Sequence, residues 1–163
     1  MRPGTGQESV WDYPRPPKVE ASAELVVVRH RGWTLAESRG TYRVLETAGA
    51  PAYYVPPGDC DESLLVRTPK WWLCEWKGIS FAYDLRLEGE RIAAVAWSYP
   101  DPLTDLGMGY EMLRDFVAFY PQRVDECSVD GERVRPQPGG YYGGWITSRV
   151  VGPFKGIPGS ERW

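Results

Sequence analysis

The sequence predicts a mainly β domain, an antiparallel barrel or sandwich with one short helix at most. Its 163 residues fit a single domain. Eight tryptophans and ten tyrosines, residue types that suit strands and fill cores, lie on a chain that 18 glycines and 15 prolines break into short runs. Turn signals separate these runs at intervals of about 8–12 residues, which is typical of antiparallel β proteins.

The first twenty residues predict an extended arm. Prolines interrupt them repeatedly, and they show neither a helical nor an alternating period. Trp11 and Tyr13 are too apolar to remain in solvent, so this arm should lie against the body of the domain. We therefore expect a flexible N-terminus over residues 1–7 and a single domain over residues 8–163 that includes the arm.

Strands are expected between residues 25 and 57. The run 25–38 alternates around a turn at Gly32 and predicts a hairpin. Residues 41–47 predict a strand or one short helical turn; in a strand, Arg43 and Val44 would lie on opposite faces. Residues 51–57 are short and bounded by prolines, which predicts an edge strand.

Two further hairpins are expected in the second half of the chain. Their turns fall at Glu88-Gly89 and at Asp130-Gly131, where glycine can take the positive φ of a tight turn. Between them, residues 110–114 have the only helical pattern, and residues 116–120 return to a strand. The C-terminal residues after 136 are rich in glycine and aromatics, which predicts bulges or a close approach to a ligand.

Charge and cysteine content bear on the class of protein. The formal net charge is -3, and Lys and Arg are mixed with Asp and Glu, so no nucleic-acid partner is expected. The longest apolar runs are far too short for a membrane span, and no secretion signal is visible. Cys60, Cys74 and Cys127 are odd in number and far apart, which indicates free thiols in a reducing compartment. We expect a cytoplasmic protein with no membrane partner.

Eight segments of the chain form an ordered series of motifs. They are ESVWDYPRPP, YRVLET, YYVPP, CEWKG, AWSYPDP, VAFYP, DGERVRPQPGGYYGGWIT and VGPFKG. This series resembles that of the domain of unknown function 427 family of bacteria and fungi, from about Gln7 to Lys155. The resemblance implies two antiparallel sheets leaning together as a β-tent or open barrel, with at most one or two short helices.

Two properties of related proteins are not expected here. Many β-tent proteins hold zinc through Cys-x-x-Cys pairs, and this chain has no such pair. The family sometimes carries a nucleotidyltransferase label, which requires carboxylates that hold magnesium near a Gly-Ser helix start. Gly159-Ser160 lies at the C-terminus, and Asp59 and Asp61 lack that context. We therefore expect neither a metal nor a cofactor.

The stretch KWWLCEWKGIS, residues 70–80, is the first candidate for a functional site. If it is one strand, alternation places Cys74 with Trp72 and Trp76 on one face, and Glu75 with Lys77 on the other. Burying those two charges unpaired would be costly, so the pattern predicts either an ordinary surface ion pair or a partly wet cavity. The family resemblance, which places CEWKG beside other polar and aromatic motifs, favours the cavity.

Cys74 is a weaker candidate than the two charges. A nucleophilic thiolate needs a neighbouring cation or an orienting base, and the one histidine, His30, lies in a predicted hairpin turn. An inert, partly buried thiol is therefore favoured.

Aromatic side chains near glycine or proline suggest the walls of a site, although aromatics also fill β cores. Trp97, Tyr99, Tyr120, Tyr142 and Trp145 have this setting, and Gly143-Gly144 would leave room beside Trp145. The candidate ligand-binding residues are Arg43, Tyr54, Trp76, Lys77, Tyr99, Tyr142 and Trp145.

Three functions are compatible with this pattern. The first is binding of a small planar or polar organic ligand by a monomer or homodimer. The second is an enzyme of unknown reaction in which Lys77 or Glu75 acts as acid or base, or Lys77 as nucleophile. The third is a protein-interaction module with exposed aromatics.

Overall fold

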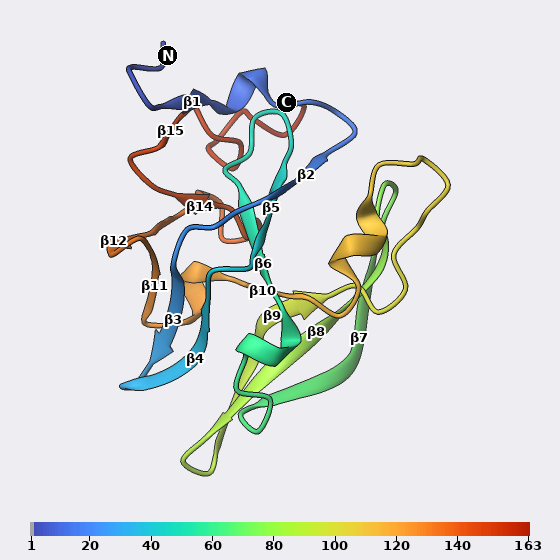
Figure 1. Cartoon of the computed structure of the whole chain (residues 1–163), viewed down its shortest axis with the longest axis vertical. Helices are drawn as coiled ribbons and strands as arrows, with labels where there is room; N and C mark the ends of the chain where they lie inside the picture. The colour runs from blue at the N-terminus through green and yellow to red at the C-terminus, as the bar shows by residue number, and fades with distance from the viewer. Residues whose placement is uncertain (1) are drawn as a thin grey trace.

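Two antiparallel sheets dominate the computed structural model of the chain, which describes residues 2–163 (Figure 1). The larger sheet has the strand order β2 (Lys18–Ala21), β5 (Tyr42–Leu45), β6 (Ala52–Val55), β10 (Val117–Phe119), β9 (Glu90–Ser98), β8 (Gly78–Leu87) and β7 (Leu65–Cys74). The smaller has the order β12 (Glu132–Arg133), β11 (Glu126–Val129), β3 (Val26–His30) and β4 (Trp33–Ser38).

Two short strand pairs complete the β structure. β1 (Glu8–Ser9) pairs in parallel with β15 (Val150–Val151), and β13 (Arg135–Pro136) pairs antiparallel with β14 (Trp145–Ile146). No sheet among residues 2–163 closes into a barrel. The predicted mainly β, antiparallel fold class is thus confirmed.

Among residues 2–163, helical structure is limited to single 3₁₀ turns. They are η1 (Val10–Asp12), η2 (Pro57–Asp59), η3 (Tyr110–Leu113) and η4 (Pro121–Arg123). The helix expected near residues 110–114 is η3; η2 and η4 each start at a proline, whose fixed φ suits the first position of a helical turn. No helix in the described part of the chain is long and apolar enough to cross a membrane.

The main core lies between the two large sheets. Residues that point inward from the smaller sheet meet residues from one face of the larger; among them are Val26, Val28, Leu35, Tyr53, Leu85, Val117 and Phe119. Burying these side chains supplies the main stabilisation, at about 1.5–3 kcal/mol for each large apolar side chain. On the opposite face of the seven-stranded sheet, a second apolar cluster forms around Tyr54, Tyr99 and Leu113.

The three predicted hairpins are confirmed, and their turns share one geometry. Both central residues have positive φ at Arg31-Gly32 (48° and 78°), at Glu88-Gly89 (52° and 79°) and at Asp130-Gly131 (49° and 80°). This is the type I′ pattern, which matches the twist of the strands it joins. Glycine at the second position adopts this positive φ without steric strain, so the local sequence was enough to place the three turns.

The prediction of an edge strand at residues 51–57 was wrong. β6 lies inside the seven-stranded sheet, between β5 and β10. Pro51 and Pro56 fall just outside its bounds, so neither proline removes a hydrogen bond from the ladder. The true edges of the sheet are β2 and β7.

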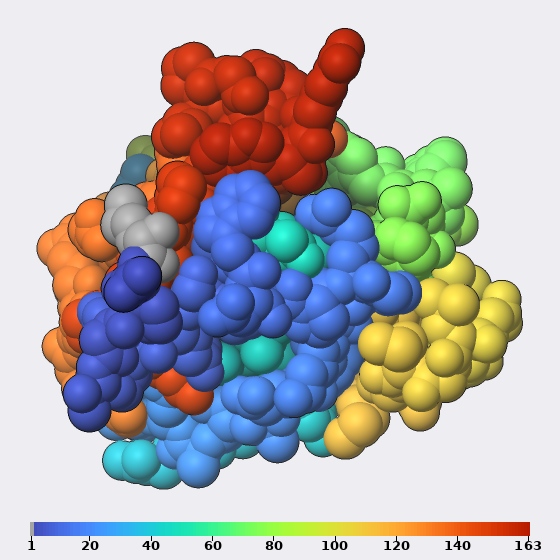
Figure 2. Space-filling model, turned by 90° about the horizontal axis from the view of Figure 1, so that it is seen from above, coloured from blue at the N-terminus to red at the C-terminus, as the bar shows by residue number. Residues whose placement is uncertain are grey.

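An ion-pair cluster attaches the N-terminal arm to the domain. The Arg43 guanidinium of β5 is fully buried; its Nη2 lies 2.9 Å from Glu8 Oε1 and 3.2 Å from Glu20 Oε1. Arg149 Nη2 lies 3.2 Å from Glu8 Oε2, and the Tyr13 hydroxyl donates a hydrogen bond to Glu8 Oε1 at 2.7 Å. The blue arm accordingly lies across the cyan β5–β6 region in Figure 2. Met1 lies outside the described residues, and the proposed boundary after residue 7 stays a prediction.

Replacing Arg43 should destabilise the fold. Arg43→Met leaves Glu8 and Glu20 without their shared buried cation, and we expect the free energy of unfolding in urea to fall by about 3 kcal/mol. Arg114→Met is the matched control, because Arg114 pairs at the surface with Asp101 and should cost less than about 1 kcal/mol. Equal losses for the two variants would contradict this role for Arg43.

Candidate functional site

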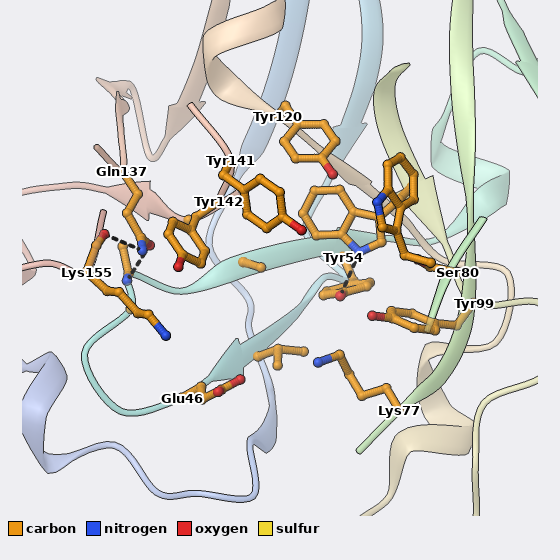
Figure 3. A pocket seen from close by; sticks show the side chains of 18 of the residues that line it. Glu46, Tyr54, Lys77, Ser80, Tyr99, Tyr120, Gln137, Tyr141, Tyr142 and Lys155 are labelled. Atoms are coloured by element: carbon orange, nitrogen blue, oxygen red, sulfur yellow. Dashed lines mark hydrogen bonds between the residues drawn. The ribbon is translucent and has the colours of Figure 1, made fainter. Parts of the chain in front are cut away.

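A cavity of about 370 Å³ lies on the face of the seven-stranded sheet opposite the main core (Figure 3). Strand alternation assigns residues to the two faces. On β6, Tyr53 points into the core while Tyr54 lines the cavity; on β5, Val44 lines it as the partner of Ala52. The cavity therefore lies on the reverse side of the strand β6 whose Tyr53 enters the core.

Seven aromatic side chains line the cavity: Tyr54, Trp72, Trp97, Tyr99, Tyr120, Tyr141 and Tyr142. Four of them form a chain of neighbouring rings. Centroid distances are 6.3 Å from Tyr99 to Tyr54, 5.9 Å from Tyr54 to Trp97, and 4.6 Å from Trp97 to Tyr120. Trp97 Nε1 also donates to the Tyr54 hydroxyl at 3.0 Å, so these rings hold one another in place.

Residues 137–155 form the facing wall, and Gln137 holds it. The buried Gln137 amide accepts a hydrogen bond from the Ala50 N–H and donates one to the Lys155 carbonyl, both at 2.9 Å. Gly143 lies so close to the Trp97 ring that a Cβ at this position would overlap it. The missing side chain at Gly143 thus sets how near this wall approaches the sheet.

The segment 70–80 is not one strand, as expected from its sequence, but a hairpin. β7 ends at Cys74, residues 75–77 form the turn, and β8 begins at Gly78 with a φ of 107°. Cys74 and Gly78 are cross-strand partners, so the alternation that separated Cys74 from Lys77 does not apply. Lys77 turns back instead, and its Nζ lies 3.4 Å from Cys74 Sγ.

Lys77 is buried at the cavity while Glu75 is not. Lys77 is 7% exposed, and its carbonyl accepts a hydrogen bond from the Leu103 N–H at 2.9 Å. The Lys77 ammonium points toward the cavity in Figure 3. Glu75 is exposed on the turn and does not line the cavity. An acid and base pair made of Lys77 and Glu75 is therefore not assembled here.

Charged residues at the cavity are mostly cations. Arg15, Lys77, Arg123 and Lys155 line it, against one carboxylate, Glu46. The chain as a whole carries a net charge of -3, so the cavity has the opposite sign to the molecule. A cleft lined by one sign of charge concentrates ligands of the other sign.

Burial keeps the tyrosine hydroxyls of the cavity floor protonated. It raises the pKa of Tyr99 well above the ordinary value, with Tyr54 and Cys74 adding to the rise. Burial likewise raises the pKa of Tyr54. It also raises the pKa of Tyr120, although the positive charge of the neighbouring Arg123 lowers that pKa in part. These hydroxyls can donate hydrogen bonds to a ligand near neutral pH but cannot act there as anions.

The structure brings together four of the seven candidate ligand-binding residues. Tyr54, Lys77, Tyr99 and Tyr142 line the cavity. Arg43, Trp76 and Trp145 do not, and each has a physical reason for its place.

Arg43 pairs with Tyr53 across the β5–β6 ladder, so it lies on the opposite sheet face from Tyr54. Its guanidinium donates a hydrogen bond to the Glu8 carboxylate there. Trp145 is 1% exposed in the core, 4.9 Å from the Tyr53 ring centroid, and donates to the Phe119 carbonyl. The space at Gly143 lies beside Trp97, and the space at Gly144 lies beside Gln137 and Ala50.

Trp76 lies in the turn of the β7–β8 hairpin. It packs at the edge of a second apolar cluster that contains Tyr54, Tyr99 and Leu113. The strand pattern placed it beside Cys74, but alternation ends at the turn.

Several cavity residues were not singled out as ligand-binding from the sequence. Trp97 and Tyr120 had been recognised as aromatics near proline, but the sequence could not decide between core and cavity. Lys155 and Gln137 carry no local signal, because only the long-range approach of the C-terminal segment brings them to the sheet. Trp72 lines the cavity although the predicted strand face had paired it with Cys74 and Trp76.

Burial disfavours the thiolate at Cys60 and Cys127, whereas Cys74 has the Lys77 ammonium 3.4 Å from its Sγ. Burial raises the pKa of Cys60 to about 12 and raises that of Cys127 as well. Among residues 2–163, no cluster of three or more His, Cys, Asp or Glu side chains could hold a metal ion.

Exposed apolar side chains occur on the β7–β8 hairpin. Trp71, Leu73 and Ile79 are 58%, 69% and 43% exposed, and the pairs Trp71–Phe81 and Leu73–Ile79 place them on one hairpin face. The interaction-module hypothesis therefore stays a prediction.

Filling the space at Gly143 should displace the facing wall. We expect Gly143→Ala to lower the free energy of unfolding by about 1–3 kcal/mol, because its methyl group would overlap Trp97. Gly58→Ala is the control, since a Cβ there meets open space at ordinary φ. Urea denaturation of both variants measures the difference, and a Gly143→Ala protein as stable as Gly58→Ala would contradict the close contact.

The raised tyrosine pKa values can be tested by titration. Between about pH 9 and 11, where an ordinary tyrosine ionises, Tyr99 should stay protonated. Tyr99→Phe should leave the tyrosinate absorbance change of the folded protein unaltered, yet reduce it by one tyrosine in urea. Since folding favours the neutral form, the free energy of unfolding should fall as pH rises above about 10. A reduced change in the folded variant would show that Tyr99 titrates normally.

Comparison with known proteins places the chain in a family. Residues 18–130, more than half of the chain, match the family model described as "Domain of unknown function (DUF427)". No curated protein matches it. The matched range includes Tyr54, Lys77 and Tyr99 but ends before the facing wall of the cavity. The ordered motifs, the antiparallel fold and this match agree, and the chain belongs to the DUF427 family.

Proposed function

We propose that the protein binds a small organic molecule with a planar part in this cavity. The observation that carries the proposal is the convergence of seven aromatic side chains on a space of about 370 Å³. Ligand sites of drug-sized molecules have volumes of about 300–1,000 Å³, with mainly apolar walls and a few polar groups. Planar ligands gain most from such walls, because rings stack on one another.

The walls are largely preformed, which supports binding. The Trp97–Tyr54 hydrogen bond and the Gln137 amide fix side chains on both sides of the cavity before any ligand enters. Side chains that are already ordered lose little further entropy on binding. The polar groups available to the ligand include the Lys77 ammonium and the hydroxyls of Ser80, Tyr99, Tyr120, Tyr141 and Tyr142.

The location and assembly expected from the sequence stay predictions. Three free thiols suit a reducing compartment such as the cytoplasm, and both a monomer and a homodimer are compatible with a cavity built from one chain.

A neutral planar probe tests the proposed function. We expect calorimetric titration to show binding of 2-naphthamide and much weaker binding of its saturated analogue, decahydronaphthalene-2-carboxamide. Trp72→Ala should lower the affinity for 2-naphthamide by about 3- to 10-fold, because one stacking partner is lost.

Trp33→Ala is the matched control for Trp72→Ala. Trp33 is also an exposed tryptophan, but it lies on β4, bonds to Glu88 and does not line the cavity. Its removal should leave the affinity unchanged. Equal affinity of the planar and saturated probes, or equal effects of the two tryptophan variants, would overturn the proposal.

A further inference from the structure

The Lys77 ammonium is a buried cation without an anionic partner. The Lys77 residue is 7% exposed, and its ammonium lies 3.4 Å from Cys74 Sγ and 5.7 Å from the centroid of the Tyr99 ring. Lys77 belongs to none of the ion pairs among residues 2–163. A thiol and an aromatic face compensate a buried charge far less than a carboxylate does.

The other cations at the cavity already have protein oxygen atoms as partners. Arg15 pairs with Glu46 at 3.7 Å, Arg123 donates to the Ala94 carbonyl at 2.7 Å, and Lys155 donates to the Trp163 carbonyl at 3.3 Å. Lys77 differs from all three, because no protein oxygen is bonded to its ammonium among the described residues. It is the cation left for a ligand.

The geometry points to an organic anion as the ligand: a planar molecule whose carboxylate pairs with Lys77. This inference rests on the proposed function and adds to it the charge of the ligand and the group that receives it. A carboxylate at Lys77 would form a charge-assisted hydrogen bond and remove the cost of the unpaired ammonium. The surplus of cations at the cavity would favour the same sign of ligand.

The β7–β8 turn holds Lys77 ready for this contact. The Leu103 N–H donates a hydrogen bond to the Lys77 carbonyl, and Gly78 packs against Leu103. These contacts hold the backbone of the turn in place. The side chain is held between Cys74 and Tyr99 and is directed toward the interior of the cavity (Figure 3). A cation fixed in this way loses little freedom when it pairs with an anion.

The ring-lined surroundings favour an organic anion over a small inorganic one. Tyr54, Trp72 and Tyr99 line the same cavity as Lys77, and an inorganic ion would leave these apolar surfaces uncovered. A planar body carrying the carboxylate covers the rings and delivers the charge at the same time.

The test compares two probes of nearly equal shape, an anionic carboxylate and its neutral amide. Calorimetric titration measures 2-naphthoate and neutral 2-naphthamide against the wild type, Lys77→Met, Lys77→Arg and Lys155→Met. We expect the wild type to prefer 2-naphthoate by on the order of 10- to 100-fold. Lys77→Met should abolish that preference and still bind 2-naphthamide, whereas Lys77→Arg should keep it.

Lys155→Met is the matched control, because it removes a cavity cation that is already bonded to a carbonyl. It should retain most of the preference. Raising the salt concentration from about 20 mM to about 500 mM should weaken 2-naphthoate and not 2-naphthamide, a readout that needs no variant.

Each failure has a distinct meaning. Wild-type protein that binds both probes equally, or a folded Lys77→Met protein that keeps the full preference, would overturn the inference and leave the proposed function standing. If neither probe binds the wild type, both are overturned. Near-ultraviolet circular dichroism establishes that the variants are folded, and Lys77→Gln is measured in the same way if Lys77→Met is not.

Discussion

The seven-stranded sheet has to serve two different environments, and strand alternation is the constraint that separates them. On neighbouring positions of β6, Tyr53 enters the core and Tyr54 enters the cavity. On β5 the same rule sends Arg43 to the ion pairs of the N-terminal arm and Val44 to the cavity. Because one backbone positions both sets, the cavity takes its rigidity from the core behind it.

How much of this could be predicted from sequence depends on the range of the interaction. The type I′ hairpins were predictable because Gly32, Gly89 and Gly131 satisfy a requirement that acts within two residues. The position of β6 inside the sheet was not, since its neighbours β5 and β10 are set by long-range pairing. The cavity needs the same kind of information, because only the tertiary fold brings Lys77 and Lys155 to one cavity.

The segment around Lys77 shows why a pattern rule can choose the right residue for the wrong reason. Alternation over residues 70–80 placed Lys77 beside Glu75 and away from Cys74, on the assumption that the strand continued. The chain instead turns at residues 75–77, which exposes Glu75 and returns Lys77 to the side of Cys74. Gly78 was the available signal: its positive φ makes it the residue that closes a turn and begins β8.

The two sides of the cavity have different relations to the family. Lys77, with Tyr54 and Tyr99, lies inside the matched range 18–130, whereas Gln137 and Tyr142 on the facing wall lie beyond it. The group proposed to hold an anion thus lies in the range that the family model matches, and the facing wall comes from the later motifs DGERVRPQPGGYYGGWIT and VGPFKG. In the proposed function, Lys77 anchors the charge of the ligand, and rings from both parts of the chain, such as Trp97 on the sheet and Tyr142 on the facing wall, limit its shape. A change in the C-terminal wall would then alter which planar ligand fits while the anchor for its charge stays in place.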